Sequence, residues 1–375
     1  MKYRRFGKTN LNLSVFSLGL MRCCYSEKQL FETVKKAVTL GINHIETAQG
    51  YGKSETYLGR TLKKLSVNRK NIILTTKIVP SINPEIMRAK LFQSLAHLQV
   101  DYIDCLAIHG VNTEEHLQQL QTKDSYIAIL LEAKEKGIIR HLGFSTHGSL
   151  ELIEKAVNTE LFDFINLHYY YFFQRNYSII QLAEKKDLGV FIISPGDKGG
   201  KLYQPPIKLT NLSQPFTPLE LNYRFLLDNP FITTLSVGAA NPEELIQPLK
   251  VANKDFSLTL EEKEIFKKIE VNAKETLQTD SCSQCYQCLP CPENINIPEV
   301  LRLRNLGVGL DMTEYASYRY QMFENAGHWF WGKKADKCTD CGECLPRCPE
   351  KLNIPDLLRD SHSRFNGSGG RRLWE

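Results

Sequence analysis

Short apolar runs alternate with longer amphipathic segments along the first 270 residues of the chain. Each run is 5 to 7 residues long and is flanked by Gly, Pro or polar residues, which is typical of buried β-strands. We therefore predict eight strands, at Ser14–Leu18, Ile42–Ala48, Asn71–Lys77, Ile103–His109, Ile139–Ser145, Phe164–Tyr169, Val190–Ser194 and Thr233–Val237.

The segments between these runs show helical periodicity, as in SEKQLFETVKKAVTLG and NPEIMRAKLFQSLAHLQ. Pro84 follows Asn83 at a first helical position, and Gly41, Gly137 and Gly189 stand where helices are expected to end. Eight strands alternating with about eight helices predict an α/β fold, a parallel (β/α)8 TIM barrel. The alternative, an open doubly wound sheet, usually carries GxGxxG after its first strand, whereas SLGLMRCC stands here.

The region from about residue 277 onward contains an internal repeat. CPENINIPEVLR begins at Cys291 and CPEKLNIPDLLR begins at Cys348, and the two segments are identical at 8 of 12 positions. The stretch between them has a helical pattern. We expect the barrel to occupy residues 1–272 and a small, mainly helical domain to occupy residues 273–375.

The composition is that of a globular protein, with 42% hydrophobic and 24% charged residues. No apolar run approaches the length of a transmembrane helix, and no hydrophobic segment follows the basic N-terminus as in a secretory signal. The net charge of +5 comes from basic residues interleaved with acidic ones. We expect a cytoplasmic protein that binds neither nucleic acid nor membrane.

Eight of the eleven cysteines lie in the C-terminal region, in two runs. In the reducing cytosol such clustered thiols are not expected to form disulfides. The second run reads C-x2-C-x2-C-x3-C-P, the spacing that binds a [4Fe–4S] cluster in bacterial ferredoxins, and the first run is one residue shorter at its last gap. The predicted ligands are Cys282, Cys285, Cys288, Cys291, Cys338, Cys341, Cys344 and Cys348.

Eight thiolates suit two [4Fe–4S] clusters, and in two-cluster ferredoxins the fourth cysteine of each run ligates the other cluster. The alternative is a zinc ribbon, which uses two CxxC pairs for each ion. Four cysteines within one short run, followed by Pro, fit a cubane better than a ribbon. The C-terminal domain is therefore predicted to be ferredoxin-like, of the helical type because a long helical insert separates the runs.

Polar residues stand at the ends of consecutive predicted strands of the barrel. Glu46, Lys77 and His109 close the second, third and fourth strands, and Tyr51 follows Glu46 in the next loop. Catalytic residues of β/α barrels lie at the carboxyl ends of the strands. We therefore expect a carboxylate, a phenol, an ammonium and an imidazole to face one mouth of the barrel.

These segments resemble the aldo-keto reductase family. MKYRRFGKTNLNLSVFSLG is similar to its N-terminal hairpin and first strand, and INHIETAQGYGKSE to its second strand and catalytic loop. ILTTK and DCLAIHG match its Lys and His segments, and HLGFST and NPEEL match its cofactor segments. With the cysteine region, the whole chain resembles the members that carry a C-terminal ferredoxin-type domain.

The resemblance implies NAD(P)H-dependent reduction of a small aldehyde or ketone, with Tyr51 as the general acid. A free phenol has a pKa of about 10, and the ammonium of Lys77, held by Glu46, would lower it. His109 would orient the carbonyl by a hydrogen bond. Glu46 is a departure, because the family usually has Asp at this position.

The resemblance also implies a binding site for NADP(H) or NAD(H). The implied cofactor-binding residues are Ser145, Thr146, Asn166, Ser194, Gly238, Asn241 and Glu244. Thr146 and Asn166 replace the usual Asn and Gln, and Ile193 stands where an aromatic residue often stacks on the nicotinamide. The segment around Glu244 has no basic residue of the kind that often holds a 2′-phosphate, so only family habit favours NADP over NAD.

Two functions are consistent with the sequence. In the leading hypothesis the barrel reduces a carbonyl compound, and the clusters exchange electrons with a partner protein or brace the C-terminal region. In the alternative the barrel is repurposed, and the ferredoxin-type domain acts as an electron carrier or a redox sensor. Glu46, Thr146 and Ile193 favour the second hypothesis, and binding of NADPH or NADH to the purified protein would separate the two.

Overall fold

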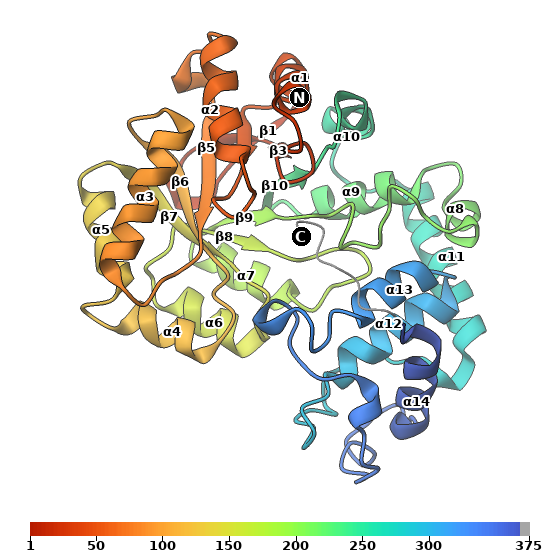
Figure 1. The fold of residues 1–375 in the computed structure, drawn as a ribbon. Helices are drawn as coiled ribbons and strands as arrows, with labels where there is room; N and C mark the ends of the chain where they lie inside the picture. Colours follow the sequence, from red (N-terminus) through yellow and green to blue (C-terminus); the bar gives the residue numbers. More distant parts are fainter. Residues whose placement is uncertain (368–375) are drawn as a thin grey trace. The chain divides into compact units, whose positions relative to one another are not determined.

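The computed structural model describes residues 1–367, which form two compact units (Figure 1). The first unit contains Met1–Gly199 and Asn222–Ser257, and the second contains Gly200–Leu221 and the described residues from Leu258 onward. The domain boundary expected near residue 272 stays a prediction. Residues 368–375 of the predicted C-terminal domain lie outside the described residues.

The first unit is built on a closed barrel of eight parallel strands, in the order β10-β3-β4-β5-β6-β7-β8-β9. These strands are β3 (Phe16–Gly19), β4 (His44–Glu46), β5 (Ile73–Ile78), β6 (Ile103–His109), β7 (Ile139–Ser145), β8 (Phe164–Leu167), β9 (Gly189–Ile192) and β10 (Ile232–Val237). The predicted (β/α)8 barrel is confirmed. Its register pairs Glu46 with Thr75 and His109 with Ser145, so the strand ends that carry the polar residues lie beside one another.

A two-stranded hairpin precedes the barrel and contributes to its core. The hairpin consists of β1 (Tyr3–Arg5) and β2 (Asn12–Ser14), which pair in antiparallel fashion. Phe6 and Leu13 from this region are fully buried in a cluster with Cys105, Phe164 and Phe191 from the barrel strands. The ring of Phe6 lies 5.3 Å from that of Phe164, so an apolar plug fills this part of the barrel.

Helices connect the strands, and most begin at a polar capping residue (Figure 1). Asn83 accepts hydrogen bonds from the backbone N–H groups of Glu85 and Ile86, as its position before Pro84 predicts. The helices that lie between barrel strands are α1 (Glu27–Thr39), α2 (Ser54–Lys64), α3 (Pro84–Leu98), α4 (Glu114–Gln121), α5 (Tyr126–Glu135), α6 (Leu150–Asn158), α7 (Tyr177–Lys185), α8 (Ile207–Ser213) and α9 (Pro218–Asp228). The helix α10 (Ile246–Ala252) follows the last strand.

The second unit is helical in its described part. Its main helices are α8, α11 (Leu260–Leu277), α12 (Ile297–Gly309), α13 (Thr313–Tyr320) and α14 (Ile354–Phe365). Helices α12 and α14 begin at matching positions of the sequence repeat, each with Pro in its first turn. Among the helices of residues 1–367, none combines the length and the apolar composition that a bilayer-spanning segment requires.

Candidate functional site

The structure brings together the four polar residues predicted from the strand ends of the barrel. Glu46 ends β4, Lys77 lies near the end of β5, and His109 ends β6. The loop after β4 returns toward β5, because the N–H of Gln49 donates to the carbonyl of Lys77 at 2.9 Å. This return places the ring of Tyr51 6.0 Å from the ring of His109, at an interplanar angle of 84°.

Lys77 is the centre of this group. Its ammonium donates to the Glu46 carboxylate, to the carbonyl of Thr47 at 2.9 Å and to the hydroxyl oxygen of Tyr51 at 3.4 Å. The Lys77 side chain is 1% exposed and that of Glu46 is 5% exposed, so the ion pair is almost fully removed from water. Each charge of such a buried pair stabilises the other, and either charge alone would be strongly destabilising.

The extra methylene of Glu46 fits because a glycine and a serine line the space around its carboxylate. A Cβ atom at Gly19 would lie 3.0 Å from Glu46 Oε2 and 2.6 Å from Ser236 Oγ. A side chain at position 19 would therefore crowd the carboxylate. Gly19 on β3 thus leaves the room that a longer acidic residue on β4 requires, and the departure from the usual Asp is built into the neighbouring strand.

Burial controls the ionisation of the phenol and the ammonium. Desolvation raises the pKa of Tyr51 above its usual value, and the nearby thiol of Cys24 raises it further. Desolvation also lowers the pKa of Lys77 well below its usual value, and the neighbouring charge of Lys198 lowers it further. The expected lowering of the Tyr51 pKa is therefore wrong for this structure, because loss of solvation is the main cause of the shift and raises the pKa.

Asn166 and Ser145 form a second polar group beside the first. They pair in register at the ends of β8 and β7. Asn166 is 0% exposed, and neither its amide nitrogen nor its amide oxygen has a hydrogen-bond partner among the described residues. A buried amide without these hydrogen bonds is suited to a ligand that offers both a donor and an acceptor. A nicotinamide carboxamide has both.

The sequence also assigned Thr146 and Ser194 to the cofactor site. The hydroxyl of Thr146 donates to the carbonyl of Val111 at 2.7 Å and accepts from the N–H of Gly148 at 3.0 Å, so it holds the loop together. Ser194 follows β9 with a left-handed φ of 55°. Ile193 packs against the apolar cluster around Phe164.

The three residues expected near an adenosine lie together after β10. Asn241 accepts a hydrogen bond from the N–H of Glu244 at 3.1 Å, and the carbonyl of Gly238 accepts one from Arg22 at 2.8 Å. Arg22 also forms a two-pronged ion pair with Glu244. The sequence did not predict Arg22 at this site, because Arg22 lies in the loop after β3, far away in the chain. A basic residue just beyond a strand end was the one feature of the sequence that could have indicated it.

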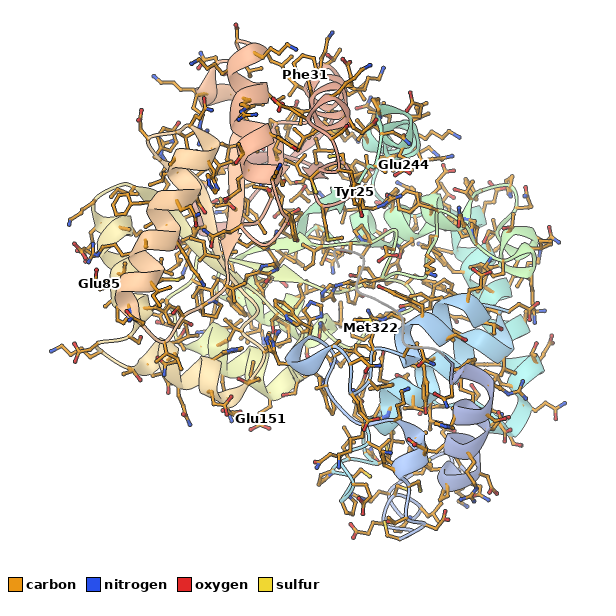
Figure 2. All side chains as sticks on the ribbon, in the orientation of Figure 1. Tyr25, Phe31, Glu85, Glu151, Glu244 and Met322 are labelled. Carbon is orange, nitrogen blue, oxygen red and sulfur yellow. The ribbon has the colours of Figure 1, made fainter. Side chains whose placement is uncertain are left out.

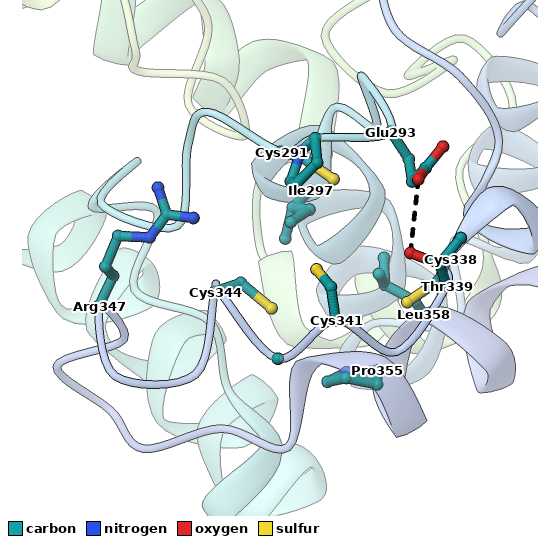
Figure 3. Close-up of a pocket in the computed structure, with 12 residues that line it drawn as sticks. Cys291, Glu293, Ile297, Cys338, Thr339, Cys341, Cys344, Arg347, Pro355 and Leu358 are labelled. Carbon is teal, nitrogen blue, oxygen red and sulfur yellow. Dashed lines mark hydrogen bonds between the residues drawn. The ribbon is translucent and has the colours of Figure 1, made fainter.

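A pocket in the second unit is lined by thiols from both cysteine runs (Figure 3). The sulfur atoms of Cys338, Cys341 and Cys344 from the second run face that of Cys291 from the first run. The rest of the lining includes Ile297, Pro355 and Leu358. Glu293, Thr339 and Arg347 also line it. Four thiols around one pocket fit an iron–sulfur cubane, which is held by four thiolates.

The remaining four thiols form the complementary group. Burial is the main cause of the raised pKa of Cys282, and the neighbouring thiols of Cys285 and Cys348 raise this pKa further. Burial, together with the neighbouring Cys282 and Cys285, raises the pKa of Cys288 to about 12. The pocket thus combines three thiols of the second run with the last thiol of the first, and Cys348 of the second run lies near Cys282 of the first. Within residues 1–367, no three His, Cys, Asp or Glu side chains are close enough to hold a single metal ion.

The structure also shows a histidine pair at the mouth of the barrel. His147 and His168 follow β7 and β8, and their Nε2 atoms lie 3.1 Å apart. Nδ1 of His168 lies 2.5 Å from the hydroxyl of Tyr170, which donates to the carbonyl of Ile193 at 2.5 Å. Because the Tyr170 hydroxyl donates its proton to the carbonyl of Ile193, its oxygen accepts from His168, and Nδ1 of His168 is therefore the donor.

The fold and these two sites define the class of protein. The chain belongs to the aldo/keto reductase family, whose sequence model matches residues 16–203, about half of the chain. A 4Fe-4S dicluster domain matches residues 281–352. The chain is therefore an oxidoreductase of this family with a C-terminal iron–sulfur domain.

Curated relatives agree with this assignment. The chain is 25% identical over 293 residues to the "Uncharacterized oxidoreductase YqkF" of Bacillus subtilis, a match that covers 68% of this chain and 92% of that protein. It is 31% identical over 157 residues to the methylglyoxal reductase DkgA of Escherichia coli, which covers 40% of this chain. The match spans only 54% of DkgA, about half of its length.

Solved structures show the same barrel. The aldo-keto reductase AKR11C1 of Bacillus halodurans in its holo form has a TM-score of 0.61 and 24% identity, covering 72% of this chain and 96% of that one. An aldo-keto reductase of Klebsiella pneumoniae in complex with NADPH has a TM-score of 0.58 and 18% identity, covering 72% and 94%. At these identities the likeness concerns the fold.

Proposed function

We propose that the barrel reduces a small aldehyde or ketone with NAD(P)H, and that the C-terminal region holds two [4Fe–4S] clusters. The convergence of Tyr51, Lys77, Glu46 and His109 at one mouth of the barrel is the observation that carries the proposal. A phenol, an ion pair and an imidazole at one point suit proton donation to a carbonyl oxygen. Asn166 supports the cofactor assignment, because its buried amide matches a carboxamide.

Tyr51 holds the proton that is given to the carbonyl oxygen. Its raised pKa keeps the hydroxyl protonated at neutral pH, so the proton is already on Tyr51 when the substrate binds. The positive charge of Lys77, 3.4 Å away, stabilises the phenolate that forms as the proton leaves. His109, whose ring stands against that of Tyr51, is the group that orients the carbonyl oxygen.

The nicotinamide, when bound, supplies the hydride to the carbonyl carbon. Asn166 and Ser145 would hold its carboxamide, since they are paired at the ends of β8 and β7. The segment after β10, with Gly238, Asn241 and Glu244, would hold the other half of the dinucleotide. Thr146 supports this site indirectly, by fixing the loop that follows Ser145.

The two groups of four thiols are the proposed cluster ligands. Cys291 completes the set of Cys338, Cys341 and Cys344, and Cys348 completes the set of Cys282, Cys285 and Cys288. This arrangement supports crossed ligation, in which each run gives its last thiol to the other cluster. An electron-transfer partner protein stays a prediction of the sequence.

Replacing Tyr51 with Phe tests the proposed reaction. The variant keeps the ring but loses the only proton donor assigned to the carbonyl oxygen, so we expect kcat for aldehyde reduction to fall by about 10²- to 10⁴-fold. Binding of NADH or NADPH, measured by calorimetry, should change less than about threefold, because the hydroxyl is not assigned to the cofactor.

Two outcomes would contradict the proposal. Wild-type turnover in the Tyr51→Phe variant would show that the phenol is not the acid. Failure of the wild-type protein to bind either dinucleotide would favour the repurposed barrel, in which only the iron–sulfur domain works.

A further inference from the structure

The two cysteine runs carry different side chains at one equivalent position. In the first run this position holds Gln284, two residues after Cys282, and in the second run it holds Asp340, two residues after Cys338. The backbone is left-handed at both, with a φ of 60° at Gln284 and 55° at Asp340. The runs lead into α12 and α14, which pack against each other (Figure 1 and Figure 2). The repeat therefore presents two different side chains from the same backbone conformation.

Gln284 directs an N–H group at a sulfur atom of the first run. Its amide nitrogen, Nε2, donates to the carbonyl of Pro298 at 3.0 Å and to Sγ of Cys282 at 3.3 Å. The carbonyl can only accept, so it holds the nitrogen rather than the oxygen of the amide on this side. Pro298 lies in the first turn of α12, so the helix fixes the donor. Hydrogen bonds to the sulfur atoms help to set the potential of an iron–sulfur cluster, and a donor stabilises the more negative, reduced form.

Asp340 directs a carboxylate at the matching sulfur of the second run. Its Oδ1 lies 3.9 Å from Sγ of Cys338. A thiolate bound to iron has no proton to donate, so this contact would set two negative groups against each other. Arg359 donates to Asp340 Oδ1 at 2.6 Å, but it also donates to Asp356 Oδ1 at 2.6 Å, so one cation serves two carboxylates. Negative charge therefore remains beside this sulfur and opposes the addition of an electron.

The other charged groups at the second run do not cancel this difference. Glu293 and Arg347 line the same pocket as Cys338. Arg347 donates to the backbone carbonyls of Glu343 and Pro290, and its guanidinium lies 3.8 Å from the Glu343 carboxylate. One cation thus stands among two carboxylates, so these groups add no net positive charge to the pocket.

We propose that Gln284 raises the reduction potential of the cluster held by Cys282 and that Asp340 lowers the potential of the cluster held by Cys338. An electron supplied by a one-electron reductant then passes from the second cluster to the first. The second cluster is oxidised, the first is reduced, and no bond or proton changes place. The C-terminal unit is therefore a directional relay. The inference rests on the proposed clusters and deepens that function by giving the order of electron transfer.

Redox titration of the anaerobically purified holoprotein, followed by electron paramagnetic resonance, measures the two potentials. The wild-type protein should show two separate one-electron steps. Gln284→Leu removes the N–H donor and should lower the higher potential by about 59 mV, which is a tenfold change in the ratio of reduced to oxidised cluster. Asp340→Asn replaces the carboxylate with an amide of similar size and should raise the lower potential by about the same amount. Each variant should leave the other step in place.

Gln287→Leu is the matched control, because it makes the same replacement at an exposed position of the same run. It should leave both potentials unchanged. Equal potentials in the wild-type protein, or a shift of the wrong step in either variant, would overturn the inference while leaving the two clusters standing. Asp340→Asn gives the decisive measurement if Gln284→Leu binds fewer than about eight iron per chain. A wild-type protein without iron and sulfide would overturn both the inference and the proposed clusters.

Discussion

The charge state of the proposed catalytic residues depends on burial more than on their immediate neighbours. Tyr51 and Lys77 both lose hydration, so each is pushed toward its neutral form, the phenol by a raised pKa and the ammonium by a lowered one. Glu46 opposes the second effect, because its carboxylate favours the charged form of Lys77. In the proposed mechanism, Glu46 therefore affects the proton donor Tyr51 through Lys77.

Removing the charge of Glu46 should weaken the proton donor. In Glu46→Gln the buried ammonium loses its counter-charge, so the pKa of Lys77 falls further and less positive charge remains near the phenol. The Tyr51 pKa then rises, and proton transfer to the carbonyl oxygen becomes harder. We expect kcat to fall by about 10- to 100-fold and the alkaline limb of the kcat–pH profile to move to lower pH, because Lys77 loses its charge before Tyr51 loses its proton.

Glu46→Asp is the matched control for this change. It keeps the charge and restores a shorter carboxylate, so the pH profile should stay near that of the wild type. Circular dichroism should show that both variants are folded. Three overlapping profiles would mean that the carboxylate does not tune the acid.

A buried histidine makes the stability of the barrel depend on pH. His44 is 0% exposed, its ring nitrogens lie 2.5 Å from Ser17 Oγ and 2.7 Å from Thr75 Oγ1, and burial lowers its pKa to about 3. The unfolded chain binds a proton near pH 6.5 and the folded protein does not, so stability is present above that pH and is lost as the pH falls toward 3.

The His44→Gln variant should lack this contribution. Between pH 6.5 and 5.5 the wild-type protein should lose about 1 kcal/mol more unfolding free energy than the variant. Urea unfolding followed by circular dichroism at the two pH values measures the difference. Parallel losses in the two proteins would show that His44 is not the titrating group.

At the scale of the elements, the loop after β4 determines where the Tyr51 phenol, the proposed acid, lies. The strand was predicted to extend over Ile42–Ala48, but β4 spans only His44–Glu46. The residues beyond it still bond to the neighbouring strand, because the N–H of Thr47 donates to the carbonyl of Thr75 at 2.9 Å. This continued pairing directs Tyr51 back toward Lys77 before α2 begins.

Close packing of α2 on α3 depends on a glycine. A Cβ atom at Gly59 would lie 2.5 Å from the carbonyl oxygen of His97 and 2.7 Å from that of Leu98. These are backbone atoms of the helix end, which cannot rotate away, so Gly59→Ala should lower the free energy of unfolding by about 1–3 kcal/mol. Urea unfolding measures this loss.

Gly50→Ala is the control for this prediction, because a Cβ atom there meets no atom within 4 Å. It should leave the stability nearly unchanged. A Gly59→Ala variant that is more stable than the wild type by about 1 kcal/mol would contradict the packing argument, because only the better helix propensity of Ala would then be seen.

At the scale of the whole molecule, the barrel and the iron–sulfur unit carry different chemistry on one chain. The thiol groups link two cysteine runs that lie 56 to 57 positions apart in the sequence. We expect the anaerobically purified protein to contain about eight iron and eight sulfide per chain, measured by chemical analysis. Stoichiometric zinc without sulfide would contradict the prediction.

Paired cysteine variants distinguish crossed from uncrossed ligation. With crossing, Cys285 and Cys348 serve the same cluster, so the double variant Cys285→Ser/Cys348→Ser should keep about four iron per chain. The matched double variant Cys285→Ser/Cys291→Ser should lose both clusters. The opposite result would show that each run ligates its own cluster.

The sequence by itself determined the eight strands, the strand-end residues of the candidate site and the eight cysteines of the cluster runs. These features are local, because strand periodicity and ligand spacing are set by residues close together in the chain. Boundaries were less accurate, as at β4, because hydrogen bonding to a neighbouring strand decides where a strand ends.

Only the tertiary structure decided which distant groups meet and how burial changes their chemistry. Arg22 reaches Glu244 across 222 positions because closure of the barrel makes β3 and β10 neighbours. Cys291 faces the thiols of the other run because the two repeats pack together. The pKa of Tyr51 rises rather than falls because the fold removes part of its solvation, and solvation is a property of the fold that no local pattern records.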